Sequence, residues 1–488
     1  MRAIAVGSLV AVTLVAGCTA ETTTSTTTST VEGTTTTTLA PTTTGPSTTS
    51  TVEAAGIDAG DGLGDSLYPL LGNEGYDVEH VQLHLDTTPW FERRAALEGR
   101  ITLTIVPSVA LDSFVLDAGS LVVRTVEVDG EPAPYEPGDQ LRIDPDAVLV
   151  AGAPADVTIG YAAPVPASRQ LSPGDGGLLP TETGLFAVGE PTGATTWRPA
   201  NDHPSDKATY EITIVTPADV VGVTGGVLTA TEAVPGGTAR TFVLDDPVAS
   251  YLVPLVVDAD LELIDHADDG TPDVRDWVDA SLGLSESLLG TQVAMVDFFE
   301  GIFGPYPFPT AGAAVVDRAF WGAIETQTLS TFAPNAVQDF VIAHEIAHQW
   351  VGNSVSVADW SDIWLNEGFA TYAEWLWMEE AGVRSVEESA RRAVSRVDAA
   401  GVDFGPGEPP PDDLFNRIVY ERGGLTLHAL RSTIGDAAFF EVLAEWTDRF
   451  AYGNAGTADF VDLAEEVSGT DLGALFDDWL FGAMPELP

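Results

Sequence analysis

Residues 344–348 are His-Glu-Ile-Ala-His, and after a gap of 18 residues comes Glu367, in Asn366-Glu367-Gly368-Phe369-Ala370. Histidines four positions apart share one face of an α-helix, with Cβ atoms about 5–6 Å apart, so both imidazoles can reach one metal ion. Glu367, from a second helix, would complete a set of three ligands and leave a fourth position for water. The pattern predicts a metal-dependent hydrolase in which Glu345 takes a proton from that water.

The flanking residues predict where this first helix begins and which way its ligands face. Asn335 and Gln338 have the spacing of a capping box, and Gly352 predicts the end of the helix. Phe340 and Val341 share a stripe with the two histidines, so the ligands should point toward a core or a cleft. The alternative is a polar helix with two chance histidines. With 7 His in 488 residues, a chance motif has a probability on the order of one in a hundred.

Composition bounds the size and the partners of the protein. A chain of 488 residues with 44% hydrophobic content predicts two or three domains. Its 74 acidic residues against 20 basic ones give a net charge of −54, which would repel nucleic acid and anionic lipid headgroups. The acidity suits a surface kept soluble in salt, and it could also attract cationic peptides. Activity measured against salt on neutral and cationic substrates would separate these two explanations.

The N-terminus predicts export. Arg2 precedes an apolar run from Ala3 to Val15, which is too short for a comfortable membrane span. Residues 14–18, Leu-Val-Ala-Gly-Cys, resemble a bacterial lipoprotein signal whose cysteine is lipidated after cleavage. We therefore expect a signal peptide over 1–18 and a lipid anchor at Cys18 on the extracytoplasmic side of the bacterial cell envelope. Cys18 is the only cysteine, so no intramolecular disulfide can form. An ordinary secretory signal is the alternative.

The rest of the chain divides into three parts. Residues 19–65 are dominated by threonine and serine and predict a disordered linker. Alternating apolar residues and Gly/Pro turns predict an all-β domain over 66–265. Longer helical periodicity starts with Val274 to Phe303, and a short strand is expected around Ala313 to Val316. A helix from about Asn366 to Trp377 follows the metal helix, so 266–488 is expected to be α+β and mostly helical.

Four segments together resemble the zinc aminopeptidases of the aminopeptidase N and leukotriene hydrolase type, a family of gluzincin metallopeptidases. The first is the metal motif with Glu367. The others are Trp321-Gly322-Ala323-Ile324-Glu325-Thr326, the stretch Gly189-Glu190-Pro191-Thr192-Gly193-Ala194, and Val419-Tyr420-Glu421-Arg422-Gly423-Gly424. They follow the family's order and spacing over residues 76–488. The resemblance implies a saddle-like N-terminal β domain followed by a thermolysin-like zinc peptidase domain.

The resemblance also implies a role for each site residue. His344, His348 and Glu367 would bind one Zn²⁺ per chain, and Glu345 would be the general base. Tyr420 would stabilise the oxyanion, and Glu190 and Glu325 would hold the free α-ammonium group of a peptide substrate. Gly322 and Ala323 would lie along the substrate backbone. Two carboxylates converging on a partly dry pocket favour a cation there, which a chain-internal amide does not offer.

Two departures from the family affect the expected specificity. The family's Asn after the substrate glutamate is Thr326 here, which alters one polar contact to the substrate. The chain ends about 68 residues after Tyr420, so we expect no large C-terminal helical domain; the cleft would then be more open or be covered by a second subunit. Alternatives are a thermolysin-like zinc endopeptidase, an epoxide hydrolase, and a catalytically inactive surface binding lipoprotein.

Overall fold

The computed structural model describes residues 56–60, 62–167, 176–266, 272–284 and 289–487. All of them belong to one compact unit, Ala54–Pro488. The expected signal peptide, Cys18 and most of the expected linker lie outside the described residues. No helix in the described part of the chain is both long and apolar enough to cross a membrane.

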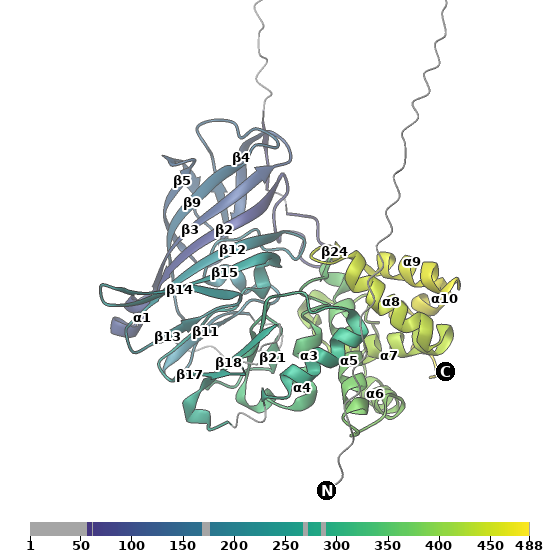
Figure 1. Ribbon diagram of the computed structural model, residues 1–488. Helices are drawn as coiled ribbons and strands as arrows, with labels where there is room; N and C mark the ends of the chain where they lie inside the picture. The colour runs from purple at the N-terminus through teal and green to yellow at the C-terminus, as the bar shows by residue number, and fades with distance from the viewer. Residues whose placement is uncertain (1–55, 61, 168–175, 267–271, 285–288, 488) are drawn as a thin grey trace, which may run out of the picture. The chain divides into compact units, whose positions relative to one another are not determined.

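The N-terminal half forms the expected all-β domain around a large twisted sheet (Figure 1). Apolar residues alternate along the central strands, and Val81, Leu83 and Leu85 of β2 are all buried, as expected where one face of a sheet covers a core. Eight strands make up this sheet, in the order β14 (Val227–Val234), β15 (Gly237–Ala249), β12 (Lys207–Thr216), β2 (Tyr76–Asp86), β3 (Leu97–Pro107), β9 (Ala155–Ala163), β5 (Val122–Val128) and β6 (Glu131–Pro132). The short helix α1 (Thr88–Arg93) connects β2 to β3.

Two four-stranded sheets complete the β domain. One has the order β1 (Ile57–Asp58), β4 (Leu111–Asp117), β8 (Gln140–Ile143) and β7 (Tyr135–Glu136). The other has the order β10 (Gly177–Pro180), β11 (Gly184–Val188), β16 (Val256–Asp258) and β13 (Val221–Val223). The sheet that contains β11 positions a candidate site residue, because Glu190 follows β11 directly.

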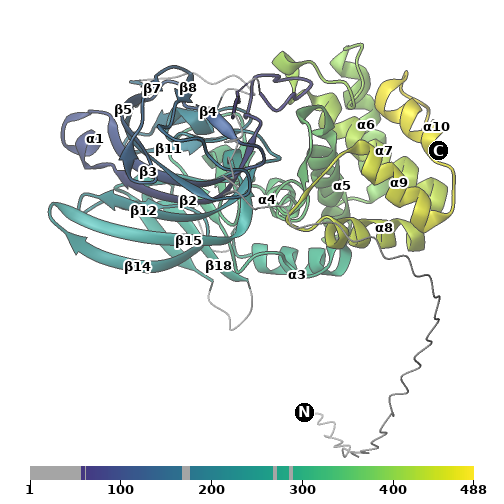
Figure 2. The same ribbon diagram turned by 90° about the horizontal axis from the view of Figure 1, so that it is seen from above.

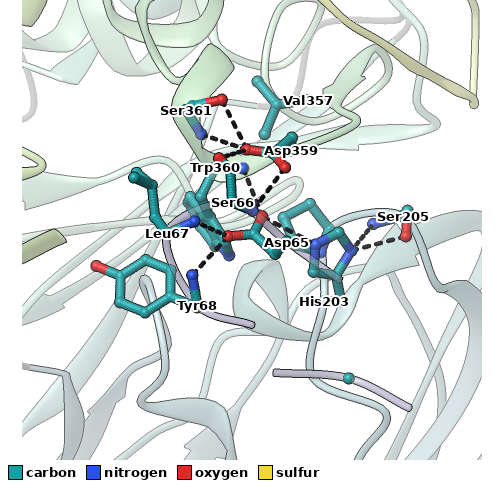
Figure 3. Close-up of polar contacts among 12 residues, drawn as sticks. Asp65, Ser66, Leu67, Tyr68, His203, Ser205, Val357, Asp359, Trp360 and Ser361 are labelled. Atoms are coloured by element: carbon teal, nitrogen blue, oxygen red, sulfur yellow. Dashed lines mark hydrogen bonds and ion pairs between the residues drawn. The ribbon is translucent and has the colours of Figure 1, made fainter. Parts of the chain in front are cut away.

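The folded body begins earlier than the expected linker boundary at residue 65, so that boundary is wrong. β1 pairs with β4, and Ala59 and Asp65 are buried. Figure 3 shows Asp65 between the two domains. Its Oδ2 accepts the Trp360 N–H at 2.7 Å and lies 3.2 Å from His203 Nε2, while the Ser66 N–H donates to Asp359 at 2.8 Å. The sequence did not predict this ordered segment, because its main anchor is a single buried Asp and not a pattern of apolar side chains.

A six-stranded sheet opens the C-terminal domain, and it corrects two expectations. Its order is β17 (Leu261–Asp265), β18 (Asp273–Asp279), β20 (Ala313–Val315), β22 (Ser330–Phe332) and β21 (Ala323–Ile324), and β19 (Thr310–Ala311) pairs with β18. Since β17 pairs with β18, the domain boundary lies before residue 261 and not at 265. Residues 274–279 form a strand, whereas the sequence predicted a helix. Buried Asp276 interrupts the apolar side of this strand and accepts hydrogen bonds from Gln292 and the Ala313 N–H.

Helices form the rest of the domain and lie on the opposite side from the β domain, with α4 at the junction (Figure 2). They are α3 (Gln292–Phe303), α4 (Asp339–Ala347), α5 (Trp364–Glu380), α6 (Val386–Ala400), α7 (Arg417–Ile434), α8 (Asp436–Arg449), α9 (Thr457–Ser468) and α10 (Gly473–Phe476). The short strands β23 (Ser356–Val357) and β24 (Asn454–Ala455) pair in parallel. Within the described residues no second helical domain follows α10. The expected architecture, a β domain followed by a mostly helical domain, is confirmed.

The metal helix starts four residues later than its expected cap. A 3₁₀ turn, Pro334–Ala336, contains Asn335, and α4 begins only at Asp339. The Gln338 side chain donates to the Asn335 carbonyl at 2.9 Å, so the two residues do not form the reciprocal bonds of a capping box. The expected stripe does reach a cavity, because Phe340 and Val341 line the same cleft as the two histidines.

Candidate metal centre and substrate cleft

Two helices bring the three predicted ligands together. His344 lies in the last turn of α4, His348 directly follows that helix in helical conformation, and Glu367 lies in the first turn of α5. Nε2 of His344 is 3.1 Å from Oε2 of Glu367, and Nε2 of His348 is 3.5 Å from the same oxygen. One ligand atom from each residue lies within 4.8 Å of the other two. Two imidazole nitrogens and a carboxylate oxygen are a donor set that fits zinc.

The other ring nitrogens have partners that turn the ligand atoms toward this centre. Nδ1 of His348 donates to the Val351 carbonyl at 3.0 Å, and a carbonyl can only accept, so the lone pair of a neutral His348 is on Nε2. Nδ1 of His344 lies 2.9 Å from Oε1 of Glu374. A carboxylate or carbonyl on the far nitrogen fixes the tautomer and makes the imidazole a better metal ligand.

Glu374 was missed in the sequence. The signal was its spacing from Glu367, because residues seven apart lie on the same face of a helix two turns away.

Glu345 lies beside the tripod in an unusual environment for a carboxylate. It is 5% exposed, and its Oε2 has no hydrogen-bond partner among the described residues. Burial raises the pKa of Glu345 to about 8; the two histidines oppose the rise, and Glu325 and Glu367 add to it. A carboxyl with an elevated pKa suits the transfer of protons to and from a reacting group near neutral pH. Its position matches the base expected from the motif.

Two more carboxylates converge next to the tripod. Glu190 and Glu325 are 2% and 3% exposed, and one oxygen of each lies within 4.8 Å of the other and of Glu367. Oε1 of Glu190 and Oε1 of Glu325 have no hydrogen-bond partner in the described part of the chain. Burial raises the pKa of Glu190 well above its ordinary range, and repulsion from Glu325, Glu367 and Glu345 adds to this. Such a group of buried acids strongly favours a cation among them.

The site opens into a cleft of about 690 Å³. Its wall includes Gly322 and Ala323, as expected, and β21 lies at the edge of its sheet. A Cβ on Gly322 would meet no atom within 4 Å, so this glycine leaves open space beside the edge strand. The cleft also contains cationic and aromatic side chains that the sequence did not single out: Arg384, Arg396, Arg417 and Phe415.

Tyr420 lies in the wall of the cleft, whereas Thr326 does not. Tyr420 of α7 lines the cleft, and its ring centroid lies 6.0 Å from that of His344. Burial raises the pKa of Tyr420 well above 10, with repulsion from Glu367 and its neighbours adding to it, so the hydroxyl stays protonated and can donate. Thr326 is fully buried, and its hydroxyl donates to the Leu329 carbonyl at 2.6 Å. It stabilises the turn after β21 and does not line the cleft.

Residues 288–479 match the family model described as the Peptidase family M1 domain. The crystal structure of an M1 zinc metallopeptidase mutant from Deinococcus radiodurans, bound to a Tyr-Ser-Ala substrate, is 30% identical and superposes with a TM-score of 0.80. The match covers 88% of this chain and 99% of that one. The chain belongs to the M1 peptidase family.

Curated relatives extend the likeness of this M1-family chain to longer proteins. "Aminopeptidase M1" of Arabidopsis thaliana is 30% identical over 328 residues, which are 59% of this chain and 36% of that protein. "Glutamyl aminopeptidase" of Sus scrofa is 28% identical over 319 residues, 59% of this chain and 34% of that protein. The matched part of this M1-family chain therefore spans about a third of the length of these relatives. The expected family is confirmed.

Proposed function

We propose that this chain is a zinc-dependent aminopeptidase that removes N-terminal residues from peptides. The observation that carries the proposal is the position of Glu190 and Glu325, whose buried oxygens converge within 4.8 Å of each other and of Glu367. An ammonium group placed there would pair with the carboxylates of Glu190 and Glu325, directly beside the metal ligand Glu367. The peptide bond after the first residue would then lie at the metal centre. The relatives named as aminopeptidases and zinc metallopeptidases support this assignment.

His344, His348 and Glu367 would hold the zinc ion, which when bound would acidify a water molecule and polarise the scissile carbonyl. Glu345 would take the proton of the attacking water and pass it to the leaving amine. Tyr420 would donate its hydroxyl to the oxygen on which negative charge develops, and such pre-placed donors account for a large part of many enzymes' rates. The open edge of β21 would pair with the extended substrate backbone.

The same geometry argues against two of the three other functions that the sequence allowed. A thermolysin-like endopeptidase would gain nothing from Glu190 and Glu325, because the backbone of an internal peptide bond carries no charge to pair with them. An inactive binding protein would have no use for a complete set of three ligands, a buried acid beside them and a tyrosine facing them.

The test is the product of peptide cleavage. Purified protein with one equivalent of zinc should release amino acids one at a time from the free N-terminus of unblocked peptides, as followed by mass spectrometry. A chelator should stop the release, and added zinc should restore it. Glu345→Gln should keep zinc but lose turnover by at least about a thousandfold. Absence of bound metal in the wild-type protein, or full activity of the Glu345→Gln variant, would contradict the proposal.

We also propose that the enzyme works outside the cytoplasmic membrane, anchored by a lipid on Cys18. The support is the sequence alone, with its short apolar run and the Leu-Val-Ala-Gly-Cys segment over residues 14–18. Cys18→Ala should move the protein from the detergent phase to the aqueous phase in detergent partitioning. Equal partitioning of the variant and the wild type would contradict the anchor.

A further inference from the structure

Three aspartates outside the catalytic cleft converge where the β domain meets the six-stranded sheet of the C-terminal domain. Asp258 ends β16, Asp260 lies in the turn before β17, and Asp279 ends β18. One carboxylate oxygen from each lies within 4.8 Å of the other two. A fourth acid, Asp317, follows β20 and lies next to this cluster. Its Oδ2 accepts the Glu182 N–H at 3.3 Å, and the hydroxyls of Thr181 and Thr183, on either side of Glu182, donate to Asp258.

Backbone pairing fixes this arrangement. Leu261 of β17 pairs with Asp279 of β18, and the Ala280 N–H donates to the Asp260 carbonyl at 2.9 Å. Asp258 is held from the other side, because it pairs with Gly184 in the sheet of the β domain. Asp258 and Asp279 therefore end strands of two different sheets, and Asp260 lies in the short turn that connects these sheets.

Asp258 accepts three hydrogen bonds that fix its orientation. The Thr181 hydroxyl donates to Oδ2 at 2.6 Å, and the Thr183 hydroxyl and the Asp260 N–H donate to Oδ1 at 2.6 and 3.0 Å. Only 3% of Asp258 is exposed.

Asp279 leaves one oxygen without any partner. The backbone N–H of Ser281 donates to Oδ1 at 2.8 Å, so Oδ2 is the oxygen left to accept a ligand. This oxygen is buried and has no hydrogen-bond partner among the described residues, and the whole residue is 1% exposed. Oδ1 of Asp317 is also buried and unpartnered. In the described part of the chain, no Lys, Arg or His forms an ion pair with any of the four aspartates.

Asp258 and Asp279 are buried, whereas Asp260 is exposed. Buried carboxylates that lack a basic partner are stabilised when they coordinate a cation. We propose that Asp258, Asp260 and Asp279, assisted by Asp317, form a second metal site that binds a divalent cation of the calcium class. The donors are all carboxylate oxygens, which hard cations prefer, and the set has no imidazole or thiolate to select zinc. Calcium binds oxygens at 2.3–2.6 Å, so ligand atoms up to about 5 Å apart can share one ion, whereas magnesium demands a tighter octahedron.

Such an ion would link strands of the two domains. It would join the end of β16 in the β domain to the end of β18 in the peptidase domain. Through Asp317 it would also hold the chain segment that continues to β21, the edge strand beside the cleft. The site is separate from the zinc ligands, so calcium would act on stability and not on the chemical step.

The experiment is a calcium titration of the full chain carrying one equivalent of zinc, in buffer otherwise stripped of metal. Calcium should raise the melting temperature of the wild type by a few degrees or more and should saturate, because a ligand bound only by the native state stabilises it by mass action. Sodium chloride at matched ionic strength should give a smaller, non-saturating shift, and magnesium should be weaker than calcium. Direct analysis should find one calcium per chain.

Asp279→Asn removes one ligand charge with little change in shape and should abolish the saturable calcium shift. Without calcium this variant should melt at or above the temperature of the wild type, because one of three closely spaced carboxyl groups has been replaced by an amide. The matched control is Asp146→Asn, an exposed aspartate far from the cluster in sequence, which removes the same charge and should keep the full shift. If Asp279→Asn fails to fold, Asp317→Asn should show a reduced shift. Equal shifts in these variants and the wild type, or a wild-type shift that sodium chloride reproduces, would overturn the proposal.

Discussion

Oε1 of Glu374 lies 2.9 Å from Nδ1 of His344, on the opposite side of the imidazole from Glu367. His344 is therefore held between two carboxylates from the same helix, one in the position of a metal ligand and one behind the ring. Glu374 lines the cleft but does not belong to the set of three metal ligands. It is a positioning residue whose effect passes through the histidine.

Glu374→Gln should weaken zinc binding about 10–100-fold, because a neutral amide stabilises the metal-bound imidazole less than a carboxylate does. Competition against a fluorescent zinc chelator measures this directly. Activity at saturating zinc should be reduced much less than zinc affinity. Glu380→Gln, an exposed position near the end of the same helix, is the control and should bind zinc like the wild type. Unchanged zinc affinity in Glu374→Gln would remove Glu374 from this role.

Tyr420→Phe should reduce kcat by about 100–1000-fold while zinc content and KM change little, since a donor to the developing oxyanion acts mainly in the transition state. Steady-state kinetics with metal analysis of the same sample separates these effects. Tyr135→Phe, in β7 of the β domain, should have normal kinetics. A rise in KM with unchanged kcat would place Tyr420 in substrate binding instead.

Lys207, the only lysine in the chain, joins the β domain to the loops behind the metal centre. Its ammonium donates to the carbonyls of Asn353, Ser354 and Gly453 at 3.0, 2.9 and 2.8 Å, which matches its three N–H donors. Lys207→Met should destabilise the fold by about 2–3 kcal/mol, as urea unfolding would show.

Arg124→Met is the comparison for Lys207, because Arg124 makes an exposed ion pair with Glu98. Exposed pairs contribute less than about 1 kcal/mol. A loss in Lys207→Met no larger than that in Arg124→Met would show that the three carbonyl contacts do not stabilise the domain junction.

Asp202 should give the stability of the fold a measurable pH dependence. Burial, with repulsion from Asp117, raises the pKa of Asp202 to about 7, against about 4 in the unfolded chain. The native state then binds the extra proton, so this contribution is fully present below pH 4 and is lost as pH rises through 7. Relative to Asp202→Asn, the wild type should lose melting temperature between pH 5 and 8. A constant difference across that range would show that Asp202 does not titrate there.

The metal tripod could be predicted from sequence because its geometry is local. The spacing of His344 and His348 fixes their common face, and Glu367 needs only a second helix packed against the first. The metal-binding helix and the β domain followed from periodicity in the same way.

Features created by single buried polar residues could not be predicted. Asp276 occupies a buried position of β18, and because a polar residue stands there the strand was predicted as part of a helix. Asp65 is also buried, and it anchors a segment that was expected to be linker. Each carboxylate looks like a surface residue until the donors it meets are known, and those donors are far away in sequence. The convergence of Glu190 and Glu325 was inferred only through the family resemblance, because they come from different domains.

The most direct test of the account compares a peptide with its N-acetylated twin. Acetylation removes the charge that Glu190 and Glu325 are placed to bind and leaves the scissile bond unchanged. We predict that kcat/KM falls by at least about 100-fold on acetylation, in line with the loss of a buried charge pair. The ratio should shrink toward one in Glu325→Gln. Equal kcat/KM for the free and acetylated peptides in the wild type would contradict the assignment as an aminopeptidase.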